Sequence, residues 1–209
     1  WDCHADILPV LPPYCSLCGD PVGGRIDHSY VCHFCSTVQP SFAVARSAAH
    51  YEGPVAEMLK ALKYKRATWL AADLACLLAA LARQHLALDR IDAVTFVPLH
   101  HTRLRTREYN QSALLARELA RLTGRSYMNR LLRRCRKTVS QTSLTARQRL
   151  DNVKNSFQHR NATWLEGRRI LLVDDVMTTG ATVNECAKTL KMGGAGRVDV
   201  LTVARGVKI

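Results

Sequence analysis

The run from Ile170 to Thr182 combines two kinds of side chain that bind sugar phosphates. Asp174 and Asp175 follow four apolar residues, and a stretch rich in threonine comes two residues later. Backbone N–H groups in such a loop, its hydroxyl groups and the start of a following helix can together bind one phosphate. Adjacent carboxylates would repel that phosphate unless they bind sugar hydroxyl groups or a Mg²⁺ ion. A phosphate on one side and a vicinal diol on the other describe a ribose 5-phosphate.

The same run resembles the motif with which type I phosphoribosyltransferases bind phosphoribosyl pyrophosphate (PRPP). The shared pattern is four apolar residues, two acids, two apolar residues and then Thr-Thr-Gly-x-Thr. The resemblance implies that Asp174 and Asp175, the candidate catalytic residues, hold the ribose hydroxyls, and that Mg²⁺ accompanies PRPP. A strand–turn–helix whose acids are merely exposed is the alternative without function. The residues predicted to hold the 5-phosphate are Met177, Thr178, Thr179, Gly180, Ala181 and Thr182.

Two CxxC pairs near the amino terminus, separated by thirteen residues, predict a metal site. Such pairs direct four thiolates to one tetrahedral ion, and the proline and glycines between them suit the turns of a zinc ribbon. A short segment with few large apolar residues also needs such a metal to fold. We therefore predict structural Zn²⁺, with two disulfides or a redox pair as the alternatives; disulfides would require an oxidising compartment. The predicted ligands are Cys15, Cys18, Cys32 and Cys35, and substitutes could come from Cys3, His4, His28 and His33.

The other cysteines stand singly in the sequence. Cys76 and Cys186 have apolar neighbours and are predicted to be small core residues. Cys135 lies among basic residues and has no predicted role.

The net charge of +13 is concentrated in one part of the chain. Residues 98–150 contain 13 Lys or Arg residues and two glutamates, an excess of 11 positive charges. This clustering favours an anionic partner, either nucleic acid or a polyphosphate, over a merely solvated basic surface.

Apolar strands alternate with helical patterns, which indicates an α/β fold with a parallel sheet covered on both faces. We expect residues 1–40 to form the zinc-binding module and residues 41–209 the phosphoribosyltransferase-like domain. Residues 133–145 lack periodicity and are predicted to form a mobile loop. Strands are expected at 42–51, 93–97, 127–132, 170–173 and 198–204, and helices from Gly53 and at 69–86, 110–122, 146–153 and 181–192.

The sequence predicts a cytoplasmic protein without a membrane span. Its first residues lack the basic and apolar regions of a signal peptide. The most apolar run, 69–82, contains Asp73 and is shorter than the ~20 residues that a spanning helix needs.

The order of motifs along essentially the whole chain resembles the ComF/GntX family. It comprises the zinc knuckles, an arginine-rich stretch before Asn110-Gln111, the PRPP motif, and a spaced pattern of Gln141, Leu144, Arg147, Asn152 and Phe157. Members are associated with competence, the uptake of transforming DNA, and carry a phosphoribosyltransferase-type domain. The chain departs from the family at Glu108-Tyr109, where Gly-Phe is usual, and at Asn155, where Gly is common. A loop that needs a positive φ would be strained by Glu108.

The phosphoribosyltransferase resemblance also implies a pyrophosphate-binding loop after an earlier strand. Surface charge is the alternative interpretation for its arginines, and a flanking position is the alternative for its histidine. The PRPP-binding residues implied there are Pro98, Leu99, His100, Arg103 and Arg107.

We therefore expect a PRPP-binding, phosphoribosyltransferase-like protein of natural competence that handles single-stranded DNA. PRPP, single-stranded DNA and other competence proteins are the expected partners. The alternative is an active phosphoribosyltransferase that uses Mg²⁺, modifies an unidentified acceptor and releases pyrophosphate. The sequence contains no obvious general base for a nucleobase and no aromatic platform for stacking bases.

Overall fold

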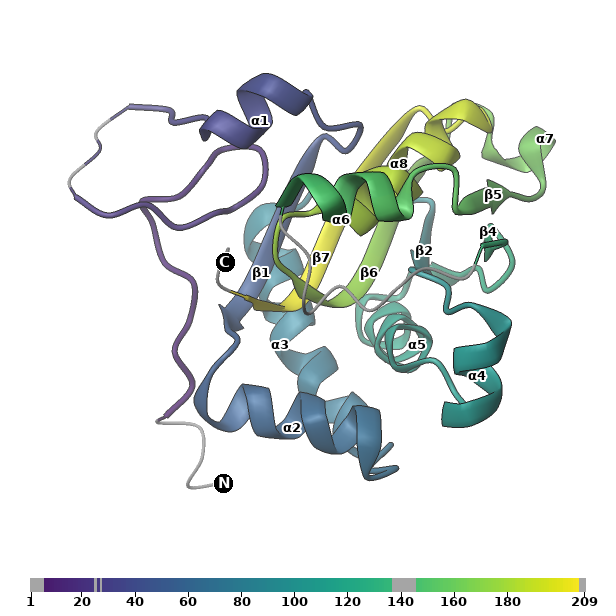
Figure 1. The fold of residues 1–209 in the computed structure, drawn as a ribbon, viewed down its shortest axis with the longest axis horizontal. Coiled ribbons are helices and arrows are strands. Elements are labelled where there is room, and N and C mark those ends of the chain that lie inside the picture. Colours follow the sequence, from purple (N-terminus) through teal and green to yellow (C-terminus); the bar gives the residue numbers. More distant parts are fainter. Residues whose placement is uncertain (1–5, 25, 27, 137–145, 207–209) are drawn as a thin grey trace.

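The computed structural model describes residues 6–24, 26, 28–136 and 146–206. Its centre is a five-stranded sheet in which every pair of neighbouring strands is parallel. The central strand, β6, is nine residues long and leads into the predicted phosphate loop (Figure 1). In spatial order the strands are β1 (Val44–His50), β7 (Arg197–Arg205), β6 (Arg169–Met177), β2 (Ala93–Phe96) and β3 (Ser126–Tyr127).

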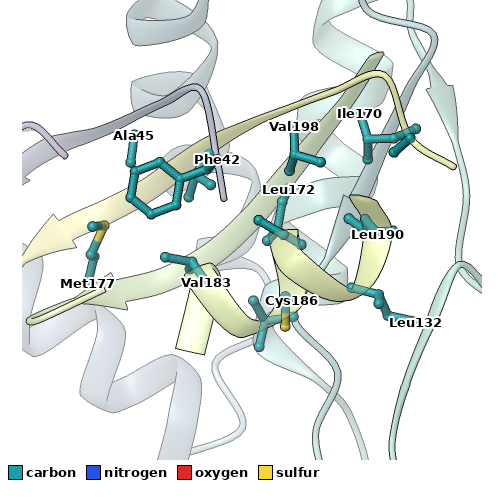
Figure 2. Close-up of a cluster of buried hydrophobic side chains, with 14 of the residues drawn as sticks. Phe42, Ala45, Leu132, Ile170, Leu172, Met177, Val183, Cys186, Leu190 and Val198 are labelled. Atoms are coloured by element: carbon teal, nitrogen blue, oxygen red, sulfur yellow. The ribbon is translucent and has the colours of Figure 1, made fainter. Parts of the chain in front are cut away.

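Helices cover both faces of this sheet because successive residues of β6 are apolar and point to opposite sides. Leu171 and Val173 belong to a core cluster with residues of α2 (Gly53–Tyr64), α3 (Leu70–His85) and α5 (Gln111–Thr123). Ile170 and Leu172 belong to a second cluster with residues of α8 (Ala181–Met192), part of which is drawn in Figure 2. The predicted doubly covered parallel sheet is confirmed.

A small antiparallel sheet pairs β4 (Leu132–Arg134) with β5 (Phe157–His159). The prediction of one strand at 127–132 was therefore wrong, because the chain turns between β3 and β4 and enters a different sheet. The predicted loop at 133–145 was wrong at its start, where Arg133 and Arg134 are strand residues. Residues 137–145 of that loop, including Gln141 and Leu144, lie outside the described residues.

Most other predicted elements are confirmed, and several short ones were missed. Helix α6 (Ala146–Val153) and helix α8 have the predicted bounds. Cys186 is buried as predicted, but Cys76 is exposed, because α3 turns it away from the stripe of leucines and alanines that faces the sheet. The elements not predicted are α1 (His33–Val38), the 3-10 turn η2 (Leu88–Arg90), α4 (His101–Arg107), β5 and α7 (Ala162–Leu165).

The cysteine-rich segment packs against the edge strand β1 (Figure 1). The backbone N–H of Ala45 donates to the carbonyl of Leu17 at 2.7 Å. Gly19 has φ of 65°, and a Cβ there would lie 2.8 Å from the Ala45 carbonyl oxygen, so this contact requires glycine. All four cysteines of the CxxC pairs are buried and belong to the same core cluster as Phe42. The division into two domains remains a prediction.

Within the described part of the chain, no helix is both long and apolar enough to cross a bilayer.

Candidate functional site

The two acids lie near the carboxyl end of β6, within the strand itself. Asp174 and Asp175 are 8% and 6% exposed. Asp174 Oδ1 accepts hydrogen bonds from the Ser112 hydroxyl at 2.8 Å and from the Asp175 backbone N–H at 3.0 Å. Ser112 stands at the start of α5, which its neighbour Asn110 caps by accepting from the Ser112 N–H. The helix that covers the sheet therefore also holds the first acid.

Asp175 lies in a network that reaches side chains on helices α2, α5 and α4. The ammonium of Lys63 on α2 forms an ion pair with Asp175 Oδ2, and both side chains are largely buried. Gln111 donates from Nε2 to Asp175 Oδ1 at 3.5 Å, and its own Oε1 accepts from Arg107 at 2.7 Å. The network thus connects the predicted residues Arg107 and Asp175 through Gln111.

Burial and pairing give the two acids different proton affinities. Burial, followed by the charge of Asp175, raises the pKa of Asp174 to about 8. Burial alone would also raise the pKa of Asp175, but the Lys63 ammonium outweighs it and lowers that pKa. Although burial favours the neutral amine of Lys63, the Asp175 carboxylate raises its pKa overall. Near neutral pH the acid pair therefore holds one negative charge, and Asp174 keeps a proton that it can release.

The predicted phosphate loop surrounds a hollow of about 20 Å³ that also borders Asp174. Gly180 has φ of 82°, which turns the chain from β6 into α8. The hydroxyl of Thr179 accepts from the backbone N–H of Ala181 at 3.4 Å, so it supports the first turn of that helix. The N–H groups at the start of a 12-residue helix favour anions. Loop and acids therefore lie side by side, as the sequence predicts.

Met177 differs from the other loop residues. Its side chain is 2% exposed and lies beside Val183 and Phe42 in the buried cluster of Figure 2. Met177 can therefore offer only backbone groups to a ligand.

The predicted pyrophosphate segment follows β2, the strand next to β6, and so reaches the same edge of the sheet. Pro98 is buried and Leu99 half-buried. His100 is buried, and its Nδ1 accepts from the Thr102 N–H at 3.4 Å, which caps α4. Arg107 on α4 is linked to the acids through Gln111, whereas Arg103 is exposed. No contact between Arg103 and the acids is seen among the described residues.

Both departures from the family pattern adopt the left-handed backbone that glycine favours. Glu108 has φ of 70° and Asn155 has φ of 55°. Glu108 thus has the positive φ for which glycine is suited, at the position where α4 ends. An exposed ion pair with Arg66 holds the Glu108 side chain at the surface.

The four cysteines of the CxxC pairs converge on one point. Their sulfurs all lie within 4.8 Å of one another, and those of Cys18 and Cys32 are 3.7 Å apart. Tetrahedral Zn–S bonds of ~2.3 Å place sulfurs about 3.8 Å apart, whereas a disulfide requires ~2.05 Å. The backbone N–H of Cys32 donates to the sulfur of Cys15 at 3.3 Å. The cluster therefore fits a tetrahedral metal ion such as Zn²⁺, and His28 and His33 are not part of it.

A larger hollow of about 560 Å³ lies at the opposite, amino edge of the sheet. Three cations line it, but Arg197 already binds Asp199 at 2.9 Å and Lys191 donates to the Gly196 carbonyl at 2.8 Å. Its size therefore does not make it the better anion site. The lining residues are Ser41, Phe42, Ala43, Gly167, Arg169, Lys191, Gly196, Arg197 and Val198.

Sequence reasoning did not assign four residues to this site; a signal existed for Lys63, Gln111 and Ser112, and none for Arg134. Lys63 lies four residues after Leu59 on the buried stripe of α2, where a cation needs a partner. Gln111 and Ser112 follow an asparagine that could be recognised as a helix cap. Arg134 is half-buried; burial lowers its pKa, and the charges of Arg103 and Asp174 act on the same guanidinium.

The chain is similar to known proteins, both in a family model and along most of its sequence. Residues 111–207 match the model of the phosphoribosyl transferase domain family. The chain is 32% identical to competence protein F of Haemophilus influenzae, with 92% of this chain and 85% of that protein covered. It is 35% identical to DNA utilization protein YhgH of Salmonella typhimurium, with coverage of 98% and 96%.

Among solved structures, the glutamine PRPP amidotransferase of B. subtilis is similar at a TM-score of 0.44 and 22% identity. That alignment covers 65% of this chain and 26% of the enzyme.

Proposed function

The chain belongs to the ComF family of competence proteins, and from that premise we propose that it binds PRPP at the carboxyl edge of its sheet. The proposed ligand spans the loop after β6 and the acid pair before it. The 5-phosphate would contact the loop between Met177 and Thr182, and the ribose hydroxyls would contact Asp174 and Asp175. We further propose that the protein acts in the cytoplasm during natural competence and handles single-stranded DNA there.

One observation carries the PRPP proposal: a small hollow at a helix start borders a buried pair of acids. The oxygens of the pair can accept hydrogen bonds from hydroxyl groups, so the pair favours a ligand that offers a diol beside its phosphate. One of the acids is already neutralised by Lys63, and the other keeps a proton near neutral pH. These two features lower the electrostatic cost of bringing an anion to this edge.

The donor set fits a hard cation as well as a diol. Carboxylate oxygens are the ligands that Mg²⁺ prefers, and Asp174 and Asp175 would hold it together with PRPP oxygens. When bound, the ion would neutralise charge on the pyrophosphate. Asp174 would first have to release its proton, because a protonated carboxyl is a poor cation ligand.

The role in competence and DNA utilisation is supported by the names of the relatives and by the basic segment 98–150. Arginine binds phosphate oxygens in a bidentate way, which suits both pyrophosphate and a nucleic-acid backbone. We propose that Arg103, which is exposed, serves the DNA, and that Arg107, which is linked to the acid pair, serves PRPP.

The PRPP proposal is tested by titration calorimetry with PRPP and Mg²⁺. One ligand per chain is expected, and Thr179→Val should weaken binding because Thr179 supports the first turn of α8 beside the hollow. Wild-type protein that gives no heat of binding would overturn the proposal.

The DNA proposal is tested by the salt dependence of oligonucleotide binding. Affinity that comes from phosphate contacts falls steeply with salt. Arg103→Ala should reduce that slope and leave PRPP binding intact, whereas Arg107→Ala should weaken PRPP binding. If Arg103→Ala instead weakened PRPP binding and Arg107→Ala reduced the salt slope, then Arg103 would serve PRPP and Arg107 the DNA.

Phosphoribosyl transfer is the second candidate function, and the raised pKa of Asp174 favours it. A group with a pKa of about 8 beside the ligand can give or take a proton at neutral pH. Transfer would break the bond between C1 of the ribose and the pyrophosphate, and an acceptor nucleophile would form the new bond at C1. Pyrophosphate release with candidate acceptors tests it; tight PRPP binding without release would reject it.

A further inference from the structure

A buried arginine joins the four-cysteine cluster to the carboxyl edge of the sheet. Arg205 is the last residue of β7 and is 3% exposed. Its Nη1 donates to the carbonyl of Cys18 at 3.0 Å, and its Nη2 donates to Asp20 Oδ1 at 2.5 Å. The same Nη2 lies 4.0 Å from the Cys18 sulfur. The side chain of Arg205 therefore contacts two atoms of Cys18 in the first CxxC knuckle and the Asp20 carboxylate that follows it.

The backbone around Arg205 contacts the phosphate loop. Arg205 pairs with Met177, the last residue of β6. The N–H of the next residue, Gly206, donates to the Met177 carbonyl at 2.9 Å. A Cβ on Gly206 would lie 2.8 Å from Thr178 Cγ2, so the chain after β7 packs directly against the start of the loop. One residue thus borders the cluster with its side chain and the loop with its backbone.

The charge of Arg205 suits a metal-loaded cluster. Four thiolates around one Zn²⁺ carry a net charge of −2, which is costly to bury without a nearby cation. Groups that contact metal ligands also fix their orientation. Losing the metal would remove the bonds that hold the four cysteines together and so free the knuckle, and Cys18 with it, to move. Such a shift would reach Met177 and Thr178 through the end of β7, because Arg205 pairs with Met177 and Gly206 lies against Thr178.

We propose that Arg205 is a positioning residue that couples the four-cysteine cluster to the phosphate loop. Loading the cluster with Zn²⁺ holds the loop in the conformation that binds a phosphate ester, and removing the metal weakens that binding. The inference rests on the proposed PRPP site for the identity of the ligand. The coupling between the cluster and the loop can be measured without any ligand, from the conformation of the loop.

The experiment compares Arg205→Met with a matched control, Arg46→Met. Arg46 also donates to the first knuckle, at the carbonyl of Ser16, but it lies on β1 and does not border the loop. Zinc content, PRPP affinity and amide hydrogen exchange of residues 177–182 are measured for each protein, before and after treatment with a zinc chelator. Circular dichroism checks that every variant keeps its fold.

Removing zinc from the wild type should lower PRPP affinity about tenfold and speed exchange in the loop. Arg205→Met should have the same defects while still containing zinc, and the chelator should add little to them. Arg46→Met should behave as the wild type. Equal defects in both variants, or an unchanged loop after zinc removal, would overturn the proposal.

The two proposals fail differently. If zinc-loaded wild type does not bind PRPP, the proposed ligand is wrong, yet the coupling is still measured by amide exchange. If PRPP binds equally well with and without zinc and loop exchange is unchanged, only the coupling is wrong.

Discussion

Lys63 on helix α2 forms a buried ion pair with Asp175 at the end of β6. Lys63 lies outside the part of the chain that matches the phosphoribosyl transferase domain model, whereas Asp175 lies within it. A helix upstream of that region therefore supplies the countercharge for the acid pair.

Lys63→Met should destabilise the protein by about 3–5 kcal/mol, because it leaves Asp175 buried without its cation. Urea unfolding at pH 7 measures this loss. The control is Lys60→Met on the same helix, where the lysine is exposed and its pair with Glu57 is solvated; its unfolding midpoint should hardly move. Equal unfolding midpoints for both variants would mean that the ion pair between Lys63 and Asp175 contributes nothing to the free energy of unfolding.

Asp174→Asn should become more stable relative to wild type as pH rises from about 4 to about 8. The pKa of Asp174 is raised in the folded state, so folded protein keeps a proton that unfolded protein releases. Wild-type stability must then fall with pH in that window, by at most about 1.4 kcal/mol per pH unit, while the asparagine does not titrate. Its amide oxygen can still accept from Ser112.

Denaturant titrations of both proteins across that pH range provide the measurement. A stability difference that does not vary with pH would show that Asp174 ionises normally.

Gly180→Ala should lower stability by about 1–2 kcal/mol, the cost of an L-residue with left-handed backbone, and should also weaken PRPP binding. Gly124→Ala is the matched control: it has φ of 66° at the end of α5 and no neighbour within 4 Å of the new Cβ. Both variants should lose thermal stability, Gly180→Ala somewhat more because its Cβ would lie 2.7 Å from Met177 Cε, but only Gly180→Ala should lose affinity in calorimetry. Equal affinities would place the ligand away from this loop.

Much of the fold could be predicted because β6 and β7 are mostly apolar runs and a helical pattern begins just after Gly180. The metal site of the four cysteines could also be predicted, because two CxxC pairs can readily direct their four sulfurs to one ion. Strands β4 and β5 could not be predicted. Each has three residues, and their pairing connects segments on either side of α6.

The two acids could be identified from their spacing in the sequence, but the side chains that surround them could not. That Lys63 reaches Asp175 depends on how α2 packs against the sheet, which periodicity does not specify. The exposure of Cys76 depends on the rotation of α3, whose sequence is apolar nearly all round.

Cys18→Ser should abolish stoichiometric zinc binding, because three thiolates and a hydroxyl hold the ion poorly. The sulfur of Cys18 is well suited to binding as a thiolate: a hydrogen bond from Cys35, assisted by the charge of Arg205, lowers its pKa to about 5. Cys76→Ser, on an exposed position of α3, is the control and should keep its zinc. Metal analysis of purified protein decides; a zinc-free wild type would contradict the metal assignment.

The most direct test of the central claim is a crystal structure of zinc-loaded protein with PRPP and Mg²⁺. The 5-phosphate should occupy the hollow between Asp174 and Val183, with the ribose hydroxyls on Asp174 and Asp175. A phosphate bound instead against Arg169 and Arg197, at the opposite edge of the sheet, would contradict it.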